Sequence, residues 1–152
     1  MREILFRGKR VDNGEWVEGC FFMRFVRPDV PPLFYNPNTH TVGVVDAIQV
    51  CDREDPASLE YHNVIPETVG QYTGLKDKNG KKIFEDDIVK SNIALWGKDK
   101  YIVSFEETRG GWYPFACGDG CGCCEEETIR TEHVTVIGNI HDNLELAEGA
   151  YE

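Results

Sequence analysis

The sequence has no apolar run of about 18 residues, the length that a membrane-spanning helix requires, so we expect no membrane segment. The stretch from Met1 to Arg7 has no apolar core of the kind found in export signals, so we expect a cytoplasmic protein. No long segment repeats apolar residues with the helical period, which excludes helical bundles and coiled coils. Apolar residues still make up 41% of the 152 residues, which suits a folded domain and excludes a disordered chain.

The sequence also lacks the glycine-rich phosphate-binding motifs and the G-x-S-x-G nucleophile motif. Of the four histidines, His141 has the most suggestive neighbour, because Asp142 follows it and a carboxylate can orient an imidazole. A histidine–aspartate pair without a nucleophile is not a catalytic triad, so we expect His141 to serve the fold of a C-terminal turn. We therefore predict no catalytic residues and a protein that is not an enzyme.

Positive charge is scarce and unevenly distributed along the chain. Lys and Arg number 16 against 27 Asp and Glu, which gives a formal net charge of −11. Because binding to nucleic acid relies on clustered Lys and Arg, this balance argues against a nucleic-acid partner. The stretch from Lys76 to Lys82 is the one local basic patch, and a weak nucleic-acid-binding module that uses this hairpin remains an alternative.

Turn residues separate many short segments that are typical of β-strands. Asp12-Asn13-Gly14 and Asn79-Gly80 lie between β-prone runs, and both predict hairpin turns because Asn and Gly tolerate positive φ. Asn143 with Glu145 predicts at most a short C-terminal helix capped by Asn143. The fold class is thus a mainly β barrel or roll. The expected strands are residues 3–7, 15–26, 42–51, 71–75, 82–84, 88–90, 101–105 and 134–138, with an extended segment over 64–72, a surface loop over 52–63 and a buried thiol at Cys20.

Four of the six cysteines, Cys117, Cys121, Cys123 and Cys124, lie within eight residues. Four thiolates can bind Zn²⁺ tetrahedrally, and the glycines between them let a short loop wrap around an ion. The spacing differs from two separated cysteine pairs, so three of these cysteines with His133 or a carboxylate form an easier ligand set. A zinc-binding protein centred on this loop is one alternative. A loop with free thiols, or with an adventitious disulfide and no cofactor, is the other.

Three blocks of sequence carry a resemblance to a known family. They comprise residues 6–10 with 14–19, residues 65–75 with 77–84 and 87–89, and residues 137–143. On these blocks the sequence resembles the YopX family of small phage and prophage proteins. The resemblance implies one mainly β domain over residues 1–152, similar to an SH3-like barrel, with variable loops at about 27–63 and 106–133. It implies a bacterial host cell, but no established activity and no catalytic or ligand-binding residues.

Two positions depart from the family pattern. Asp86 stands where glycine often precedes residues 87–89, and we expect this change to alter the turn after the hairpin. Leu144 stands where proline often follows residues 142–143, which removes a residue that favours the start of a helix.

The small β fold, the lack of a catalytic constellation and the acidic composition together favour a phage accessory protein that acts by protein–protein contact. Its partner is an unknown protein, and a homo-oligomer is one form that the contact can take. Trp112, Tyr113 and Phe115 flank the cysteine loop, where they either pack in the core or supply such a contact surface.

Overall fold

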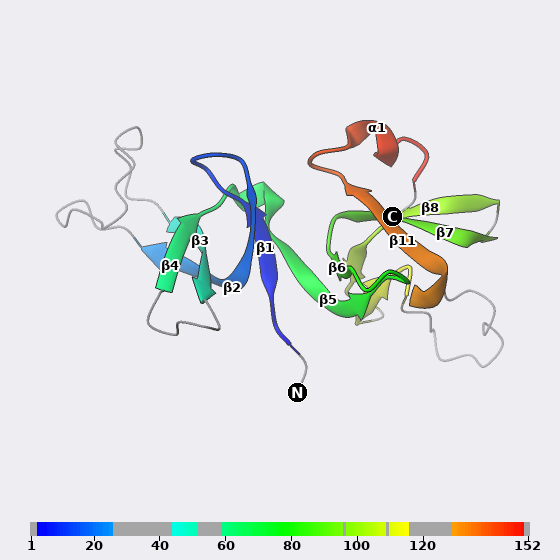
Figure 1. Ribbon diagram of the computed structural model, residues 1–152, viewed down its shortest axis with the longest axis horizontal. Helices are drawn as coiled ribbons and strands as arrows, with labels where there is room; N and C mark the ends of the chain where they lie inside the picture. The colour runs from blue at the N-terminus through cyan, green and yellow to red at the C-terminus, as the bar shows by residue number, and fades with distance from the viewer. Residues whose placement is uncertain are drawn as a thin grey trace. The chain divides into compact units, whose positions relative to one another are not determined.

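The computed structural model describes residues 3–25, 44–51, 59–95, 97–108, 110–115 and 129–150 (Figure 1). These residues form a mainly β structure with antiparallel sheets and a short C-terminal helix, α1 (Leu144–Ala147), which confirms the predicted fold class. The strands of this described part do not form a closed barrel, so the SH3-like likeness stays a prediction. Across the same ranges, none of the helices has the length and apolar character needed to span a bilayer.

The chain divides into two compact units, an N-terminal unit (Leu5–Val69) and a C-terminal unit (Gly70–Glu152, with Met1–Ile4). Each unit is described by itself. The expectation of a single domain over residues 1–152 stays a prediction.

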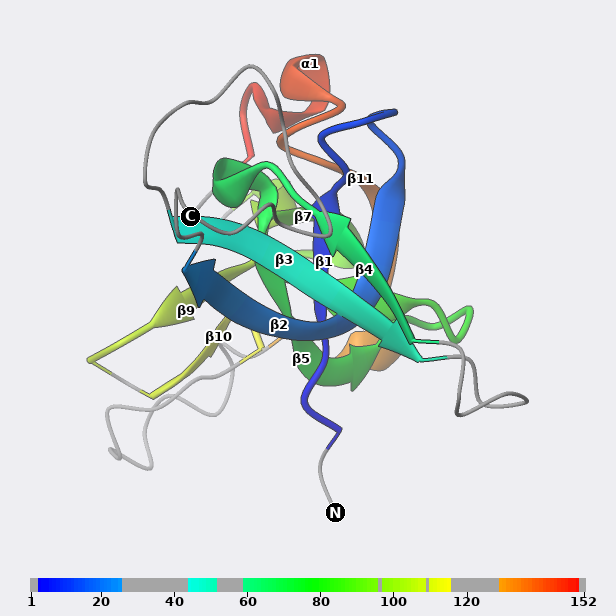
Figure 2. The ribbon, with the colours of Figure 1, turned by 90° about the vertical axis from the view of Figure 1, so that its left-hand side faces the viewer.

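The N-terminal unit is an antiparallel sheet whose strands follow the order β4-β3-β2-β1. Gly14, with a φ of +73°, forms the predicted turn between the first two strands, and β2 bends strongly along its length (Figure 2). The segment after the fourth strand returns to the end of β1, where Arg10 bridges Val64. The strands are β1 (Phe6–Lys9), β2 (Trp16–Phe25), β3 (Val44–Cys51) and β4 (Leu59–Asn63).

Three expectations for this unit are wrong. The segment expected to be extended over 64–72 contains a short 3-10 helix, η1 (Pro66–Thr68), because Pro66 suits the start of a helix and the N–H of Val69 donates to its carbonyl. Residues 59–63 form strand β4 rather than a surface loop, because β3 supplies the hydrogen-bond partners of this polar segment. Cys20 is exposed rather than buried. Side chains of a strand alternate between its faces, and in β2 the buried Gly19 and the half-buried Phe21 lie on the opposite face from Cys20.

The C-terminal unit contains a hairpin, a three-stranded sheet and a second small hairpin. The predicted Asn79-Gly80 turn joins β5 (Gly70–Lys76) to β6 (Lys82–Phe84), and Gly80 has a φ of +81°. The sheet order is β11-β7-β8, and β9 pairs with β10. These strands are β7 (Asp87–Leu95), β8 (Lys98–Ile102), β9 (Ser104–Glu106), β10 (Gly111–Tyr113) and β11 (Val134–Asn139).

The hydrophobic core of this unit draws on both hairpins and the sheet. Its buried members are Ile83, Val89, Tyr101, Val103, Trp112, Ile129, Val134 and Val136. Burial of eight such side chains fixes the strands, so the polar residues between them are held in defined positions.

Candidate functional site

The cysteine loop, with Cys117, Cys121, Cys123 and Cys124, lies outside the described residues. Its possible fourth ligand, His133, is described, and its Nε2 lies 3.5 Å from Glu132 Oε1. The ranges that the structure describes hold no group of three or more His, Cys, Asp or Glu side chains placed to bind a metal ion. The zinc site stays a prediction.

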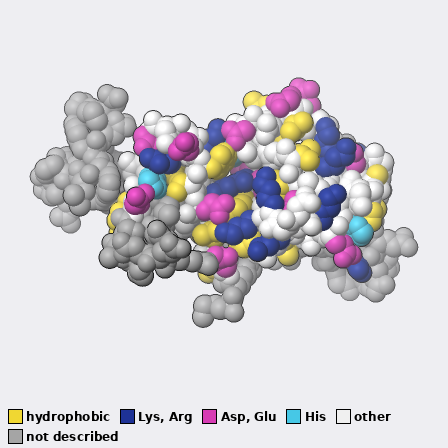
Figure 3. Space-filling view, in the orientation of Figure 1, with side chains coloured by type: hydrophobic (Ala, Val, Ile, Leu, Met, Phe, Trp, Pro, Cys, Tyr) yellow, Lys and Arg dark blue, Asp and Glu magenta, His cyan; other side chains and the backbone are white. Residues whose placement is uncertain are grey.

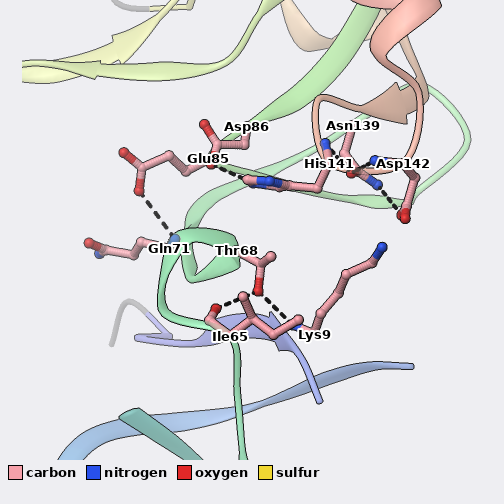
Figure 4. Close-up of polar contacts among 9 residues, drawn as sticks. All are labelled: Lys9, Ile65, Thr68, Gln71, Glu85, Asp86, Asn139, His141 and Asp142. Atoms are coloured by element: carbon pink, nitrogen blue, oxygen red, sulfur yellow. Dashed lines mark hydrogen bonds and ion pairs between the residues drawn. The ribbon is translucent and has the colours of Figure 1, made fainter. Parts of the chain in front are cut away.

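His141 belongs to a network of polar contacts that joins two of the sequence blocks within the C-terminal unit (Figure 4). Its Nε2 lies 3.0 Å from Asp86 Oδ2, 55 residues away along the chain, and both side chains are mostly buried. A backbone hydrogen bond joins the same two segments, from the N–H of Ile140 to the carbonyl of Asp86. The carboxylate at this ring nitrogen thus comes from Asp86 rather than from the adjacent Asp142, and the expected role of His141 in the fold is consistent with the geometry.

Asn139 organises the turn that carries His141. Its Oδ1 accepts hydrogen bonds from the backbone N–H groups of His141 and Asp142, each at 2.9 Å, and its Nδ2 donates to Asp142 Oδ2 at 2.8 Å. Asn143 precedes α1 as predicted, but its side chain does not cap the helix. It accepts the N–H of Asn139 instead, because residues 139–143 fold into a tight turn.

Asp86 is the one non-glycine residue with a positive φ within the described ranges, at +66°. Left-handed backbone costs an L-residue about 1–2 kcal/mol, and glycine adopts it freely. Asp86 therefore holds a conformation that glycine adopts without strain, and the contact with His141 offsets part of the cost. The expected change in this turn stays a prediction.

We expect Asp86→Gly to leave the free energy of unfolding within about 1 kcal/mol of the wild type, because relief of the left-handed strain balances the lost His141 contact. Asp86→Ala keeps the strain and loses the contact, so we expect it to be less stable than Asp86→Gly by about 1 kcal/mol. Urea denaturation of both variants measures the difference. Equal stability of the two variants would show that the backbone of residue 86 is not strained.

Asp77 lies inside the β5–β6 hairpin, and its side chain is 5% exposed. Its Oδ1 accepts the N–H groups of Asn79 (2.8 Å) and Lys81 (2.9 Å), and its Oδ2 accepts the N–H of Val136 in β11 (3.0 Å). Burial pushes the pKa of Asp77 upward, but these three donors and the nearby charge of Lys81 outweigh it and hold the pKa below its ordinary value. The carboxylate thus ties the hairpin to the sheet while it stays ionised.

The basic residues of this hairpin lie at its surface. Lys76, Lys78 and Lys81 are exposed, whereas Lys82 is half-buried and places its ammonium 5.7 Å from the centre of the Tyr72 ring. On the visible face of the molecule, Lys and Arg side chains lie among Asp and Glu side chains (Figure 3). We call the four residues Lys76, Lys78, Lys81 and Lys82 the lysine hairpin.

The aromatic residues near the cysteine loop divide between core and surface. Trp112 is buried, and Tyr113 and Phe115 pack against the same core. Phe105 in β9 is 47% exposed and meets Trp112 edge to face, with ring centres 5.1 Å apart. Phe105 was expected only as the last residue of a strand over 101–105, and its pairing with Trp112 across β9 and β10 is a property of the folded structure that no local pattern shows.

Similarity to known proteins is found at two levels. The family model described as YopX protein matches residues 32–148, which confirms the resemblance seen in the sequence. Among solved structures, the crystal structure of protein EF1440 from Enterococcus faecalis is similar to this chain, with 24% sequence identity and a TM-score of 0.44. That alignment covers 96% of this chain and 99% of the other. None of the curated proteins matches.

Proposed function

The chain belongs to the YopX family, and from this premise we propose that it is a phage or prophage accessory protein that acts by protein–protein contact without catalysis. Its site of action in this proposal is the cytoplasm of a bacterial host cell. The family assignment supports the proposed phage or prophage origin. The structural role of the polar side chains supports the proposed action without catalysis.

The observation that carries this proposal is that the polar side chains of the sequence blocks bind backbone groups. A catalytic acid or base must reach a substrate, and a side chain whose oxygen atoms accept backbone N–H groups is positioned for a structural role. Thr68 shows this in the N-terminal unit, where its hydroxyl accepts the N–H of Lys9 and donates to the carbonyl of Ile65 (Figure 4). Asp77, Asp87 and Asn139 accept backbone N–H groups in the C-terminal unit.

The contact surface in this proposal includes Phe105. Exposed aromatic side chains contribute strongly to protein interfaces, because they bury a large area with little loss of conformational freedom. The ring of Phe105 is held in place by Trp112, which belongs to the core, so this surface is rigid before a partner arrives.

We expect Phe105→Ala to reduce saturable capture of a protein partner from bacterial lysate at least about tenfold, as is common for a central aromatic contact. Ile93→Ala is the matched control, because Ile93 is 46% exposed in the same unit, and we expect it to retain capture. Quantitative pull-down over a range of bait concentrations measures both variants, and light scattering after size exclusion reports whether the partner is a second copy. A clean monomer that captures nothing, or equal capture by wild type and Phe105→Ala, would contradict the proposal.

A further inference from the structure

The lysine hairpin concentrates positive charge on a chain whose net charge is −11. Residues 76–82 contain four lysines and one acidic residue, Asp77, whose carboxylate is buried beneath the turn. Three of the lysines are exposed. The surface of the hairpin is therefore basic, although the protein as a whole is acidic.

The pairing within the hairpin places like charges against each other. Lys76 and Lys82 are direct cross-strand partners in the β5–β6 ladder. Like charges in this position destabilise a sheet, and an acidic side chain at either place would be more stable. The position of the Lys82 ammonium over the Tyr72 ring offsets part of this cost. The pairing thus brings two of the four lysines close together on neighbouring strands.

The hairpin is also held rigidly. Asp77 donates its own N–H to the carbonyl of Lys81 and accepts two N–H groups of the turn on its side chain. Two further bonds reach β11, from Lys78 N–H to the carbonyl of Val134 and from Val136 N–H to Asp77 Oδ2. Because the backbone between the lysines is fixed, a ligand that binds them loses little conformational entropy from the protein.

We propose that the lysine hairpin binds an acidic segment of a partner polypeptide, an inference that rests on the proposed function and names the chemistry of its partner. Discrete carboxylates on a flexible segment match a few closely spaced ammonium groups. Nucleic acid fits less well, because single strands bind to exposed aromatic faces and residues 76–82 contain no aromatic side chain. The nearby Tyr72 is buried, so its ring is not available for a base to stack on.

Fluorescence anisotropy with a labelled oligoglutamate peptide at low salt tests this proposal on the full chain. We expect the triple variant K76Q/K78Q/K81Q to bind at least about fivefold more weakly than the wild type. The matched control is R10Q/K90Q/R130Q, which removes the same charge from three separate positions that each pair with an acidic residue, and we expect its affinity to change less than about twofold. The hairpin variant should unfold at a temperature close to that of the wild type, because it removes both the Lys76–Lys82 repulsion and the attraction between Lys81 and Asp77.

Three results would overturn the proposal. The first is the lack of measurable peptide binding, and the second is an equal loss of affinity in both triple variants, which would indicate a general charge effect. The third is tighter binding of a single-stranded DNA oligonucleotide than of the peptide through the same lysines, which would assign the hairpin to nucleic acid. None of these results changes the capture by the Phe105 surface, so failure of this inference is distinguishable from failure of the proposed function.

Discussion

Replacement of Asp77 by alanine is expected to lower the free energy of unfolding by about 3 kcal/mol or more. The reason is that three backbone N–H groups, those of Asn79, Lys81 and Val136, lose their acceptor at once. The N–H of Val136 is buried, and a buried donor left without a partner costs about 1–3 kcal/mol, while the two part-buried donors in the turn add to this loss. Chemical denaturation of the variant and the wild type measures the loss.

Asp12→Ala is the matched control for this measurement. Asp12 is an exposed carboxylate that pairs with Arg10, and exposed ion pairs contribute about 0–1 kcal/mol. We therefore expect little change from Asp12→Ala. A loss at Asp77 no larger than the loss at Asp12 would contradict the central position given to Asp77 in the hairpin.

The same carboxylate gives stability a defined dependence on pH. Because the pKa of Asp77 is lower in the folded than in the unfolded protein, its contribution is complete above the ordinary value. That contribution is lost as the pH falls through the lowered, folded-state value. Glu85 acts with the opposite sign, because its pKa is raised in the folded protein. Burial is the main cause of this rise and the charge of Asp86 adds to it, whereas the hydrogen bond from Gln71 N–H lowers the pKa. As the pH falls, protonation of Glu85 first stabilises the fold, and protonation of Asp77 at lower pH then destabilises it. Asp77→Asn should remove most of this later loss of stability.

Replacement of Gly70 by alanine is expected to lower the free energy of unfolding by about 2–3 kcal/mol. A Cβ at this position would lie 2.8 Å from the carbonyl oxygen of Glu85, closer than carbon and oxygen approach in folded proteins. The opposing atom belongs to the backbone, so the strand β5 and the corner at Glu85 must separate. Overpacking of this kind costs about 1–3 kcal/mol.

Gly149→Ala separates this steric effect from the general effect of losing a glycine. Gly149 has a φ of +79° and open space around its Cβ position, so only backbone strain of about 1 kcal/mol is expected. Thermal unfolding of both variants by circular dichroism provides the comparison. A midpoint for Gly70→Ala at or above that of Gly149→Ala would contradict the close approach to Glu85.

Local signals in the sequence predicted the parts of the fold that depend on local chemistry. The Asn79-Gly80 turn was predictable because Gly80 must supply a positive φ, and the short C-terminal helix was placed correctly after Asn143. The strand β4 was missed because its polar residues gain their hydrogen bonds from β3, which the local pattern does not reveal. A hydrogen-bonded ladder depends on both strands, so the sequence of one strand alone does not predict it.

The polar network could be predicted only in part, for the same reason. Asp77 stands two residues before Asn79, a spacing typical of a side chain that accepts the backbone N–H of a turn. The third bond of Asp77, to Val136, joins residues 59 apart in the sequence, and no local pattern predicts it. The contact of His141 with Asp86 spans 55 residues, so no local pattern predicts it.

The span of the Asp77–Val136 bond has a consequence for synthesis on the ribosome. The hairpin around Asp77 is complete early in translation, but its carboxylate gains the last donor only when β11 has emerged, 59 residues later. Until then the nascent chain exposes Ile83 and Val89, which belong to the buried core of the finished protein. The core of the C-terminal unit can therefore be completed only after β11 has been synthesised, because Val134 and Val136 supply part of it.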